Sequence, residues 1–353
     1  MLFGKNLGKS CDELIDAAAR RDADGFHKTL ERIAGATTKA KPGEVQEVLG
    51  RLAPLLAEIP IGMGGDLAKV AGGMTDFGGD PMVVLPTLVR RATDAMERAA
   101  RFATAYGEAC GDLPDAEDPS LIEATIERFV GAAPQAGLSE REAYGLVEAW
   151  FAGGDWVQPV LYLAQRKEVR TALPERARLT PAIDATREHI GTAHWLYGLL
   201  LVVDDTPLTV LHRPTGRGYR VTISGIGDNF QLHTLLAASL IGDESRGLLP
   251  GERPSPAAIA AATDGEDLTP AGGIRGQFNL VDAYGEWIWH EGRPADIPLL
   301  EGERIVVLDP PPYARSWNAG RLYPLMRPSL TVDRILAGDE AAHWLGMVKS
   351  SQR

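Results

Sequence analysis

The spacing of apolar residues changes within the segment from 199 to 242, and this change constrains the fold more than any other feature. Before it, helix signals recur over roughly the first 190 residues. After it, alternating stretches typical of strands are mixed with helical ones. The sequence therefore predicts an α+β multidomain protein. We expect an all-α domain over 1–190 and an α+β domain over 191–353 with a mainly antiparallel sheet, a proline-rich arm and C-terminal helices.

The N-terminal part carries repeated helix-start signals, in which a short polar side chain or a proline precedes an apolar helical pattern. A Ser or Thr followed three residues later by Glu predicts a capping box, and proline is favoured in the first turn. The signals are Ser10 with Glu13, Pro42, Asp80–Pro81, Asp118–Pro119, Ser139 with Glu142, and Thr180–Pro181.

A weak internal echo accompanies these helices. The tripeptide Gly-Gly-Asp occurs at 78–80 and at 153–155, and Asp24–Gly25 resembles a shorter copy. Recurring helical hairpins of this kind are typical of HEAT-like arrays, which offer a concave surface to a partner. A plain helical bundle that reuses the same capping residues explains the pattern equally well, and the sequence leaves both open.

The segment 61–80 contains seven glycines and invites comparison with phosphate-binding loops. It lacks the GxxxxGK[ST] pattern, and no strand precedes it. We therefore interpret it as a flexible connection between helices.

The C-terminal half begins with three predicted strands that form an antiparallel meander, at 192–205, 208–214 and 218–227. Asp228 or Asn229 then caps a helix over 230–242 that covers one face of the sheet. The segment 243–273 is interpreted as a surface excursion or lid. Further strands are expected at 277–284, 285–292 and 303–310, followed by the arm at 310–327 and helices at 331–337 and 339–349.

Composition excludes some classes of protein. The net charge of −12 disfavours nucleic-acid binding, and two cysteines are too few for a disulfide framework or a cysteine zinc site. The sequence has no signal-peptide pattern and no apolar run of membrane-spanning length, so we expect a soluble, cytoplasmic protein that does not contact a membrane. The Arg, Ala and Gly bias is typical of GC-rich bacterial genomes.

Acidic residues are concentrated between 107 and 149, where ten acids face two arginines, a net charge of −8. Such a segment is either a solvated face or a surface for a basic partner.

Two groups of residues could carry chemistry. Asp228, Asn229 and His233 lie at a predicted helix start, and an acid, an amide and an imidazole there could perform acid–base catalysis or bind a polar ligand. His290 is a further candidate catalytic residue. The alternative is a capping residue and a histidine bonded to a backbone carbonyl. The seven histidines show no familiar metal-ligand spacing, so no metal is expected, and the cofactor stays unassigned.

The second group lies in the arm, which has no acid but three arginines among aromatic residues. Arg315, Trp317, Arg321 and Arg327, together with Asn229, are the candidate ligand-binding residues, since arginine beside aromatic rings suits an anionic ligand. The arm and the arginines at 213, 217 and 220 could also form one basic groove. In the alternative interpretation, the arm packs its aromatic side chains on the sheet and pairs its arginines with the acidic segment.

No catalytic motif is complete, so the sequence favours a non-catalytic scaffold that binds a protein partner, with an anionic small molecule as a further ligand. The alternative is a hydrolase or transferase with Asp228, His233 and His290 in a site at the junction of the helical and α+β parts. Nucleic-acid binding is the third and least supported class.

Overall fold

A computed structural model describes residues 7–265 and 273–351, and it has the predicted α+β multidomain layout. The chain forms two compact units. The N-terminal unit runs to Ala164 and includes Glu168–Leu200, and the C-terminal unit contains Gln165–Lys167 and the chain from Leu201 onward. No helix of the described ranges is both long and apolar enough to cross a membrane.

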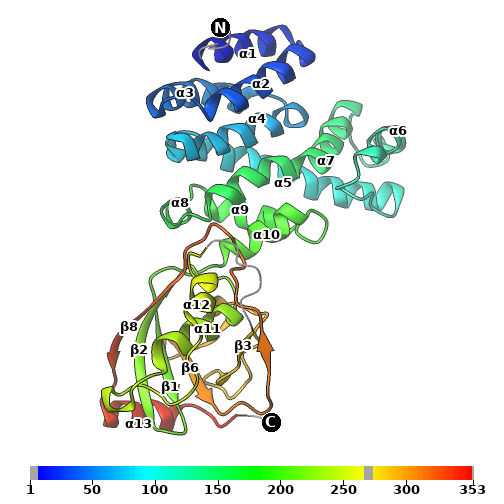
Figure 1. The fold of residues 1–353 in the computed structure, drawn as a ribbon. Helices are drawn as coiled ribbons and strands as arrows, with labels where there is room; N and C mark the ends of the chain where they lie inside the picture. The colour runs from blue at the N-terminus through cyan, green and yellow to red at the C-terminus, as the bar shows by residue number, and fades with distance from the viewer. Residues whose placement is uncertain (1–6, 266–272, 352–353) are drawn as a thin grey trace. The chain divides into compact units, whose positions relative to one another are not determined.

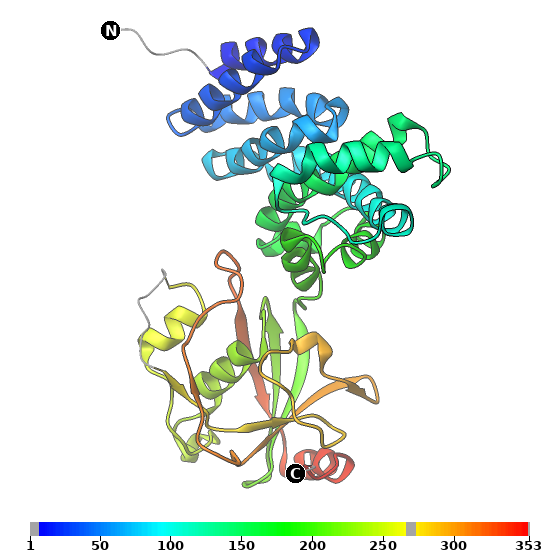
Figure 2. The same cartoon turned by 90° about the vertical axis from the view of Figure 1, so that its right-hand side faces the viewer.

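The N-terminal unit is entirely helical (Figures 1 and 2). The two longest helices, α5 and α7, pack together, and Phe102 and Trp150 meet between them with ring centroids 5.1 Å apart. The helices are α1 (Leu7–Arg20), α2 (Ala23–Thr37), α3 (Pro42–Glu58), α4 (Ile61–Gly73), α5 (Pro81–Cys110), α6 (Ile122–Ala132), α7 (Glu140–Leu163), α8 (Lys167–Thr171), α9 (Arg176–Asp184) and α10 (Gly191–Leu200), with 3₁₀ turns η1 (Met74–Phe77) and η2 (Pro119–Leu121).

Most helix-start predictions are confirmed. Pro42 begins α3, Asp80 caps α5, and Ser139 with Glu142 forms the complete capping box of α7. Asp118 caps the turn η2, which leads into α6.

Two predicted helix starts are wrong. The described part of α1 starts at Leu7, so Ser10 lies within the helix and does not cap it, and α9 begins at Arg176, so Pro181 lies within it. Pro181 is the sixth residue of α9, so it removes the N–H group that would otherwise donate to the Ala177 carbonyl, and α9 tolerates this loss within a helix of nine residues.

The glycine-rich segment is a helix rather than a flexible connection. Residues Ile61–Gly73 form α4, which packs on α7. The glycines permit this close approach, since a Cβ on Gly65 would lie 2.5 Å from the Cβ of Asp155. Glycine is unfavourable in a helix by itself, and tertiary packing overrides that preference here.

The Gly-Gly-Asp echo does not mark equivalent positions. Gly78 ends η1 with φ of +103°, in the turn before α5, whereas the copy at 153–155 lies in the interior of α7. The same tripeptide therefore has a different structural role at each position, and it gives no support to a helical repeat.

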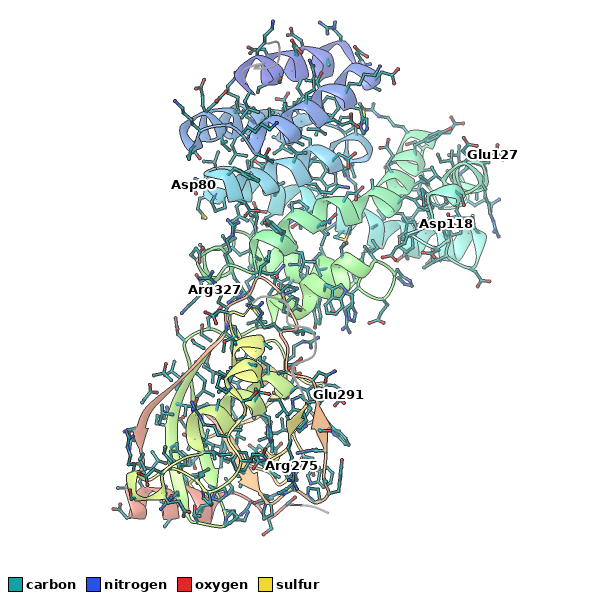
Figure 3. All side chains as sticks on the ribbon, viewed as in Figure 1. Asp80, Asp118, Glu127, Arg275, Glu291 and Arg327 are labelled. Carbon is teal, nitrogen blue, oxygen red and sulfur yellow. The ribbon has the colours of Figure 1, made fainter. Side chains whose placement is uncertain are left out.

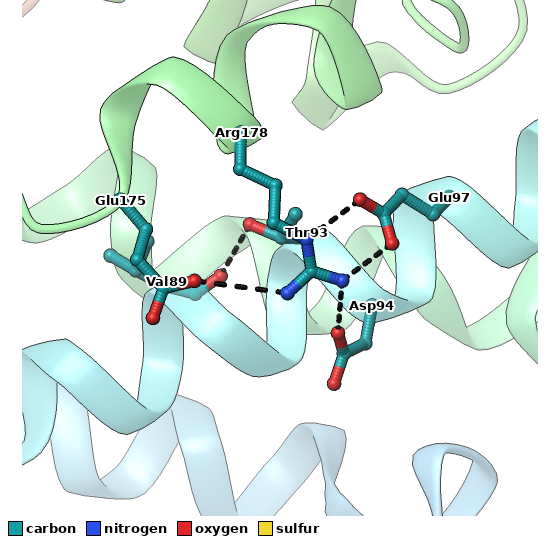
Figure 4. Close-up of polar contacts among 6 residues, drawn as sticks. All are labelled: Val89, Thr93, Asp94, Glu97, Glu175 and Arg178. Atoms are coloured by element: carbon teal, nitrogen blue, oxygen red, sulfur yellow. Dashed lines mark hydrogen bonds and ion pairs between the residues drawn. The ribbon is translucent and has the colours of Figure 1, made fainter.

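Ion pairs join the surfaces of neighbouring helices in this unit. In Figure 4 the Arg178 guanidinium on α9 reaches both Asp94 and Glu97 on α5, at 2.7 Å and 2.5 Å from Nη2. Its Nε donates to the other Glu97 oxygen at 2.8 Å. These contacts hold the pKa of Arg178 above its ordinary value, chiefly through the hydrogen bonds to Glu97 and then Asp94.

The C-terminal unit is a mixed sheet with strand order β4-β6-β1-β2-β8, in which only the β1–β6 pairing is parallel. Its elements are β1 (Thr206–His212), β2 (Arg217–Ser224), α11 (Asn229–Leu240), η3 (Glu244–Arg246), α12 (Pro256–Ala262), β3 (Ile274–Arg275), β4 (Asn279–Val281), η4 (Pro294–Asp296), β5 (Leu299–Leu300), β6 (Glu303–Asp309), β7 (Ser316–Trp317), β8 (Ser329–Ile335) and α13 (Gly338–Met347).

The alternation of apolar residues along the strands builds two cores. Leu208 and Val210 of β1 face α11, whereas Leu211 faces the opposite side, where Ala341 of α13 packs. Helices therefore cover both faces of this sheet, with α11 on the face seen in Figure 1.

Three predicted elements differ from the structure. The run 192–205 is mostly the helix α10, so β1 and β2 form a hairpin rather than part of a three-stranded meander. The segment 285–292 makes one isolated bridge, from Trp287 to Val281, instead of a strand. Residues 331–337 belong mostly to strand β8, although the helix expected at 339–349 is present as α13. Short apolar runs suit a buried helix as well as a strand, and only their packing partners decide.

The predicted excursion at 243–273 contains η3 and α12 in its described part. Residues 266–272 of that segment lie outside the described residues.

Candidate ligand-binding site

Helix α11 provides the base of the site. Asp228 caps it, because its Oδ1 accepts a hydrogen bond from the Gln231 N–H at 2.8 Å. The helix is buried nearly all round, so its polar side chains point into the interior of the unit. Burial also raises the pKa of the Asp228 carboxyl, while its backbone hydrogen bonds oppose that shift.

His233 lies one helical turn beyond Asn229 and is fully buried. Its Nε2 accepts a hydrogen bond from the Phe278 N–H at 3.2 Å, so the neutral ring carries its proton on Nδ1. That Nδ1 has no hydrogen-bond partner in the described structure. Burial lowers the pKa of His233 to about 3, and the neighbouring His290 and Arg315 add to the shift.

His290 is held beside His233, with ring centroids 5.6 Å apart. Its carbonyl accepts hydrogen bonds from the N–H groups of Asn229 and Phe230, both at 3.1 Å, which fixes it against the start of α11. Its buried Nε2 also has no hydrogen-bond partner. Burial, followed by the charge of Arg315, lowers the pKa of His290 to about 4.

Aromatic rings enclose the two histidines. The Trp317 ring centroid lies 4.8 Å from that of His233 and 5.0 Å from that of His290. Phe230 contacts His290 at 5.0 Å, and Phe278 contacts His233 at 5.6 Å. Arg315 lies beside these five rings. We call the six residues the His–Trp cluster: Phe230, His233, Phe278, His290, Arg315 and Trp317.

Arg315 brings a positive charge to the cluster. Its Nη2 donates to the Phe278 carbonyl at 2.7 Å, but its buried Nε has no partner. It forms no ion pair with a described Asp or Glu, although the Tyr313 hydroxyl, through a side-chain hydrogen bond, and the Glu291 carboxylate are near enough to influence it. Burial lowers the pKa of this guanidinium, and arginine nevertheless keeps its charge in proteins.

The cluster therefore gathers unsatisfied polar atoms. Asn229 donates from Nδ2 to the Trp289 carbonyl at 2.9 Å, while its buried Oδ1 has no partner. In the described ranges five buried side-chain atoms lack a partner: three belong to the cluster and a fourth belongs to Asn229 at the start of α11. These four are Asn229 Oδ1, His233 Nδ1, His290 Nε2 and Arg315 Nε, and the fifth is Arg91 Nε in the N-terminal unit. Such atoms are uncommon in folded proteins and need a specific explanation.

A pocket of about 280 Å³ adjoins the cluster and shares Phe230 and Trp317 with it. Asp228 and Asn318 also line this pocket, as does Arg321. Two hydrogen bonds orient the Arg321 guanidinium, which donates to the carbonyls of Thr263 and Gly265 at 2.8 Å and 2.6 Å. We call this cavity the Trp317 pocket.

The structure brings most candidate residues from the two sequence groups together in one place. Asp228, Asn229, His233 and His290 meet Arg315, Trp317 and Arg321 around α11. Arg327 does not join them, because its side chain is exposed and it lies well apart from Glu291, the neighbour of His290 (Figure 3).

The proposed basic groove is not present. Arg213 forms an ion pair with Asp309 at 2.7 Å, and Arg220 pairs with Glu303. Arg217 donates to the Leu248 and Glu244 carbonyls. These arginines are committed to contacts inside the C-terminal unit. Arg213 lines a pocket with Pro310–Pro312 at the start of the arm, but the arginines of the arm do not line that pocket.

Sequence reasoning missed Phe230, Phe278 and Asn318. Phe278 approaches His233 only because β4 begins beside α11, and nothing in the local pattern indicates that contact. An aromatic residue two positions after the Asp228 cap was a usable signal for Phe230.

The geometry gives little support to a linked acid–base pair. No hydrogen bond joins Asp228 to His233 or His290 in the part of the chain that is described, and Asp228 serves as a helix cap. The same part contains no group of three or more His, Cys, Asp or Glu side chains placed to hold a metal ion.

Comparisons with protein-family models, curated proteins and solved structures gave no match. Fold and site define a two-unit α+β protein with a candidate small-molecule site in its C-terminal unit.

Proposed function

We propose that the C-terminal unit binds a small polar molecule in the Trp317 pocket. The observation that carries this proposal is the pairing of opposite charges in one pocket, with the Asp228 carboxylate and the Arg321 guanidinium both on its lining. Phe230 and Trp317 supply apolar walls between polar groups, the usual composition of a small-molecule site.

Both charged groups are oriented before any ligand arrives. The Asp228 side chain is held by its capping hydrogen bond, and Arg321 by two backbone carbonyls. Preorganised groups lose little conformational entropy on binding, which favours affinity. A ligand with a cationic or donor group toward Asp228 and an anionic group toward Arg321 complements both, as an amino acid does.

The experiment is a calorimetric titration of the purified chain with free amino acids of differing side chains and with their decarboxylated amines. We expect binding of at least one amino acid and much weaker binding of its amine, because the amine has no group for Arg321. Arg321→Gln should abolish binding. Arg327→Gln is the matched control, since Arg327 is an exposed arginine of the same arm, and it should bind like the parent. No binding across the panel, or equal binding by Arg321→Gln, would overturn the proposal.

A second candidate is binding of a basic protein partner by the N-terminal unit. The sequence favoured a protein partner in general and offered a surface for a basic partner as one of two interpretations of the acidic segment. The support for this candidate is the acidic segment 107–149. Among the described residues, Glu142 is the only one of its ten acids in an ion pair, with Arg101 at 3.8 Å. Unpaired negative charge attracts cationic partners and speeds their association.

Titration with a lysine homopolymer of about ten residues tests this second candidate. The double variant Glu123→Lys/Glu127→Lys should weaken binding more than a control with an equal charge change elsewhere, Glu44→Lys/Glu58→Lys. Equal weakening would show that only net charge matters and would count against a defined surface.

A further inference from the structure

A larger cavity of the C-terminal unit lies where strand β6 ends, and it shares no lining residue with the Trp317 pocket. Its volume is about 720 Å³. Small-molecule sites occupy roughly 300–1,000 Å³, so this cavity can hold a whole ligand. Trp287 and the three prolines at 310–312 line it together with Arg213, Asn279 and Asp309. We call it the Trp287 pocket.

The charges of this lining compensate each other. Arg213 Nε donates to Asp309 Oδ1 at 2.7 Å, and Arg213 Nη2 donates to the Lys349 carbonyl at 3.0 Å. Among the described residues of the lining, Arg213 and Asp309 are the one cation and the one acid. A bound ion would meet no uncompensated opposite charge here, so the pocket suits a neutral ligand.

Two polar side chains of the lining keep free hydrogen-bonding atoms. Asn279 and Asp309 are only 4% and 8% exposed. Asn279 Nδ2 and Asp309 Oδ2 form no hydrogen bond with a described residue, and neither is among the fully buried atoms that lack a partner. Both atoms are therefore open to solvent, and both residues line the Trp287 pocket.

The sheet fixes these two side chains next to each other. Asn279 on β4 and Asp309 on β6 are direct partners in the antiparallel ladder. Side chains of directly paired residues lie on the same face of a sheet, with Cβ atoms about 4.5–5.5 Å apart. The pocket thus presents one amide donor and one carboxylate acceptor side by side, a spacing that suits two neighbouring hydroxyl groups.

Trp287 and its neighbour supply aromatic surface. The Trp287 indole packs on the core that contains Val281, and its Nε1 donates to Ser351 Oγ at 3.1 Å. Trp289 lies beside it, with ring centroids 6.3 Å apart, and is 68% exposed. Tryptophan is highly buried on average, so this exposed ring extends the aromatic surface beyond the pocket lining.

A pyranose sugar combines the properties that this lining matches. It is neutral, one of its faces consists of C–H groups that pack on an indole, and its hydroxyl groups both donate and accept hydrogen bonds. We propose that the Trp287 pocket binds a neutral sugar, with the sugar ring on Trp287 and adjacent hydroxyl groups bonded to Asn279 Nδ2 and Asp309 Oδ2. The next ring of an oligosaccharide contacts Trp289.

The test is a titration of the full chain with methyl glycosides of glucose, galactose, mannose and N-acetylglucosamine, and with maltose and cellobiose. The readout is the ¹H–¹⁵N spectrum of the tryptophan indoles, in which Trp287 is identified by its loss in Trp287→Phe. We expect a saturable shift of the Trp287 resonance with at least one sugar. Asn279→Ala should weaken that affinity about tenfold, since a hydrogen bond to the sugar is lost.

Asn318→Ala is the matched control, because Asn318 is an asparagine that lines the Trp317 pocket instead, and it should bind the sugar like the parent. Trp289→Ala changes an exposed side chain and keeps the proposal testable if Asn279→Ala does not fold. It should lower the affinity for the disaccharide and leave that for the single sugar unchanged.

Three results would overturn the inference. The first is the absence of a saturable Trp287 shift with every sugar of the panel. The second is an unchanged sugar affinity in Asn279→Ala, or, where that variant does not fold, an unchanged disaccharide affinity in Trp289→Ala. The third is a Trp287 shift with adenosine or uridine but with no sugar, which would assign the pocket to a planar base.

Discussion

The indole ring of Trp156 on α7 lies directly against Gly64 on α4, so that a Cβ placed on Gly64 would be 2.2 Å from Trp156 Cζ2. The same indole donates from Nε1 to the Ile61 carbonyl at 2.9 Å, and the Arg91 guanidinium lies 4.8 Å from its centroid. The contact between α4 and α7 therefore depends on the absence of one side chain.

Gly64→Ala should destabilise the protein by about 1–3 kcal/mol, because overpacking a close helix contact outweighs the better helix propensity of alanine. Gly73→Ala is the matched control in the same helix, since a Cβ there meets nothing within 4 Å. It should stabilise the protein by about 0.5–1 kcal/mol. Urea denaturation measures both changes. A stable Gly64→Ala variant would contradict the packing described for these helices.

Asp228 has a structural and a charged role, and two substitutions separate them. Asp228→Ala removes the cap of α11 and should cost about 1 kcal/mol of unfolding free energy. Asp228→Asn keeps a capping oxygen and should retain most of the stability, while it loses the carboxylate of the pocket. Chemical denaturation of the two variants checks this. Equal destabilisation by both would mean that the charge, and not the cap, supports the fold.

The histidine pair predicts a loss of stability in acid. Their folded pKa values of about 3 and about 4 lie below the ordinary value of about 6.5, so the unfolded chain binds more protons below that pH. Stability should therefore be fully present above pH 6.5 and should fall as the pH drops toward 4. Each histidine contributes up to about 1.4 kcal/mol per pH unit.

His233→Phe isolates this effect. The variant lacks one titrating ring, so the difference in unfolding free energy between it and the parent should shrink as the pH falls from 6.5 to 4. Urea denaturation at several pH values measures this difference. A difference that does not change with pH would show that His233 titrates normally in the folded protein.

Arg220 and Glu303 join strands β2 and β6 across β1. The Arg220 Nη2 lies 3.1 Å from Glu303 Oε1, and Nη1 contacts both Glu303 and, at 2.7 Å, Thr209 Oγ1 on the intervening strand. A double-mutant cycle with Arg220→Met and Glu303→Gln should give a coupling of about 1 kcal/mol, since the pair is bidentate and half-buried. The exposed pair of Arg334 and Glu340 should show a smaller coupling, and the reverse order would contradict this ranking.

The fold class followed from local patterns. Period-2 alternation predicted β1 and β2, a strand was also expected where β6 lies, and short polar side chains before apolar runs predicted the caps at Asp80, Ser139 and Asp228. The predictions at Ser10 and at 192–205 were wrong because several conformations share those local patterns. Only packing against distant segments distinguishes them.

The candidate site was partly predictable for the same reason. The sequence indicated that Asp228 and His233 share the start of one helix, because their separation is local. It did not indicate that Arg315 and Trp317, some eighty residues later, would enclose His233, or that Arg327 would lie elsewhere.

The sequence by itself determined most of the helices in the N-terminal unit, strands β1 and β2 and several caps, since hydrogen bonds between near neighbours and side-chain periodicity depend on only a few residues. The tertiary structure alone decided that a glycine-rich segment is a helix, that Arg213 and Arg220 are paired within the C-terminal unit, and that three of the unsatisfied polar atoms belong to one cluster beside a pocket. These outcomes depend on contacts between residues far apart in the chain, where close packing and desolvation, rather than local preference, set the free energy.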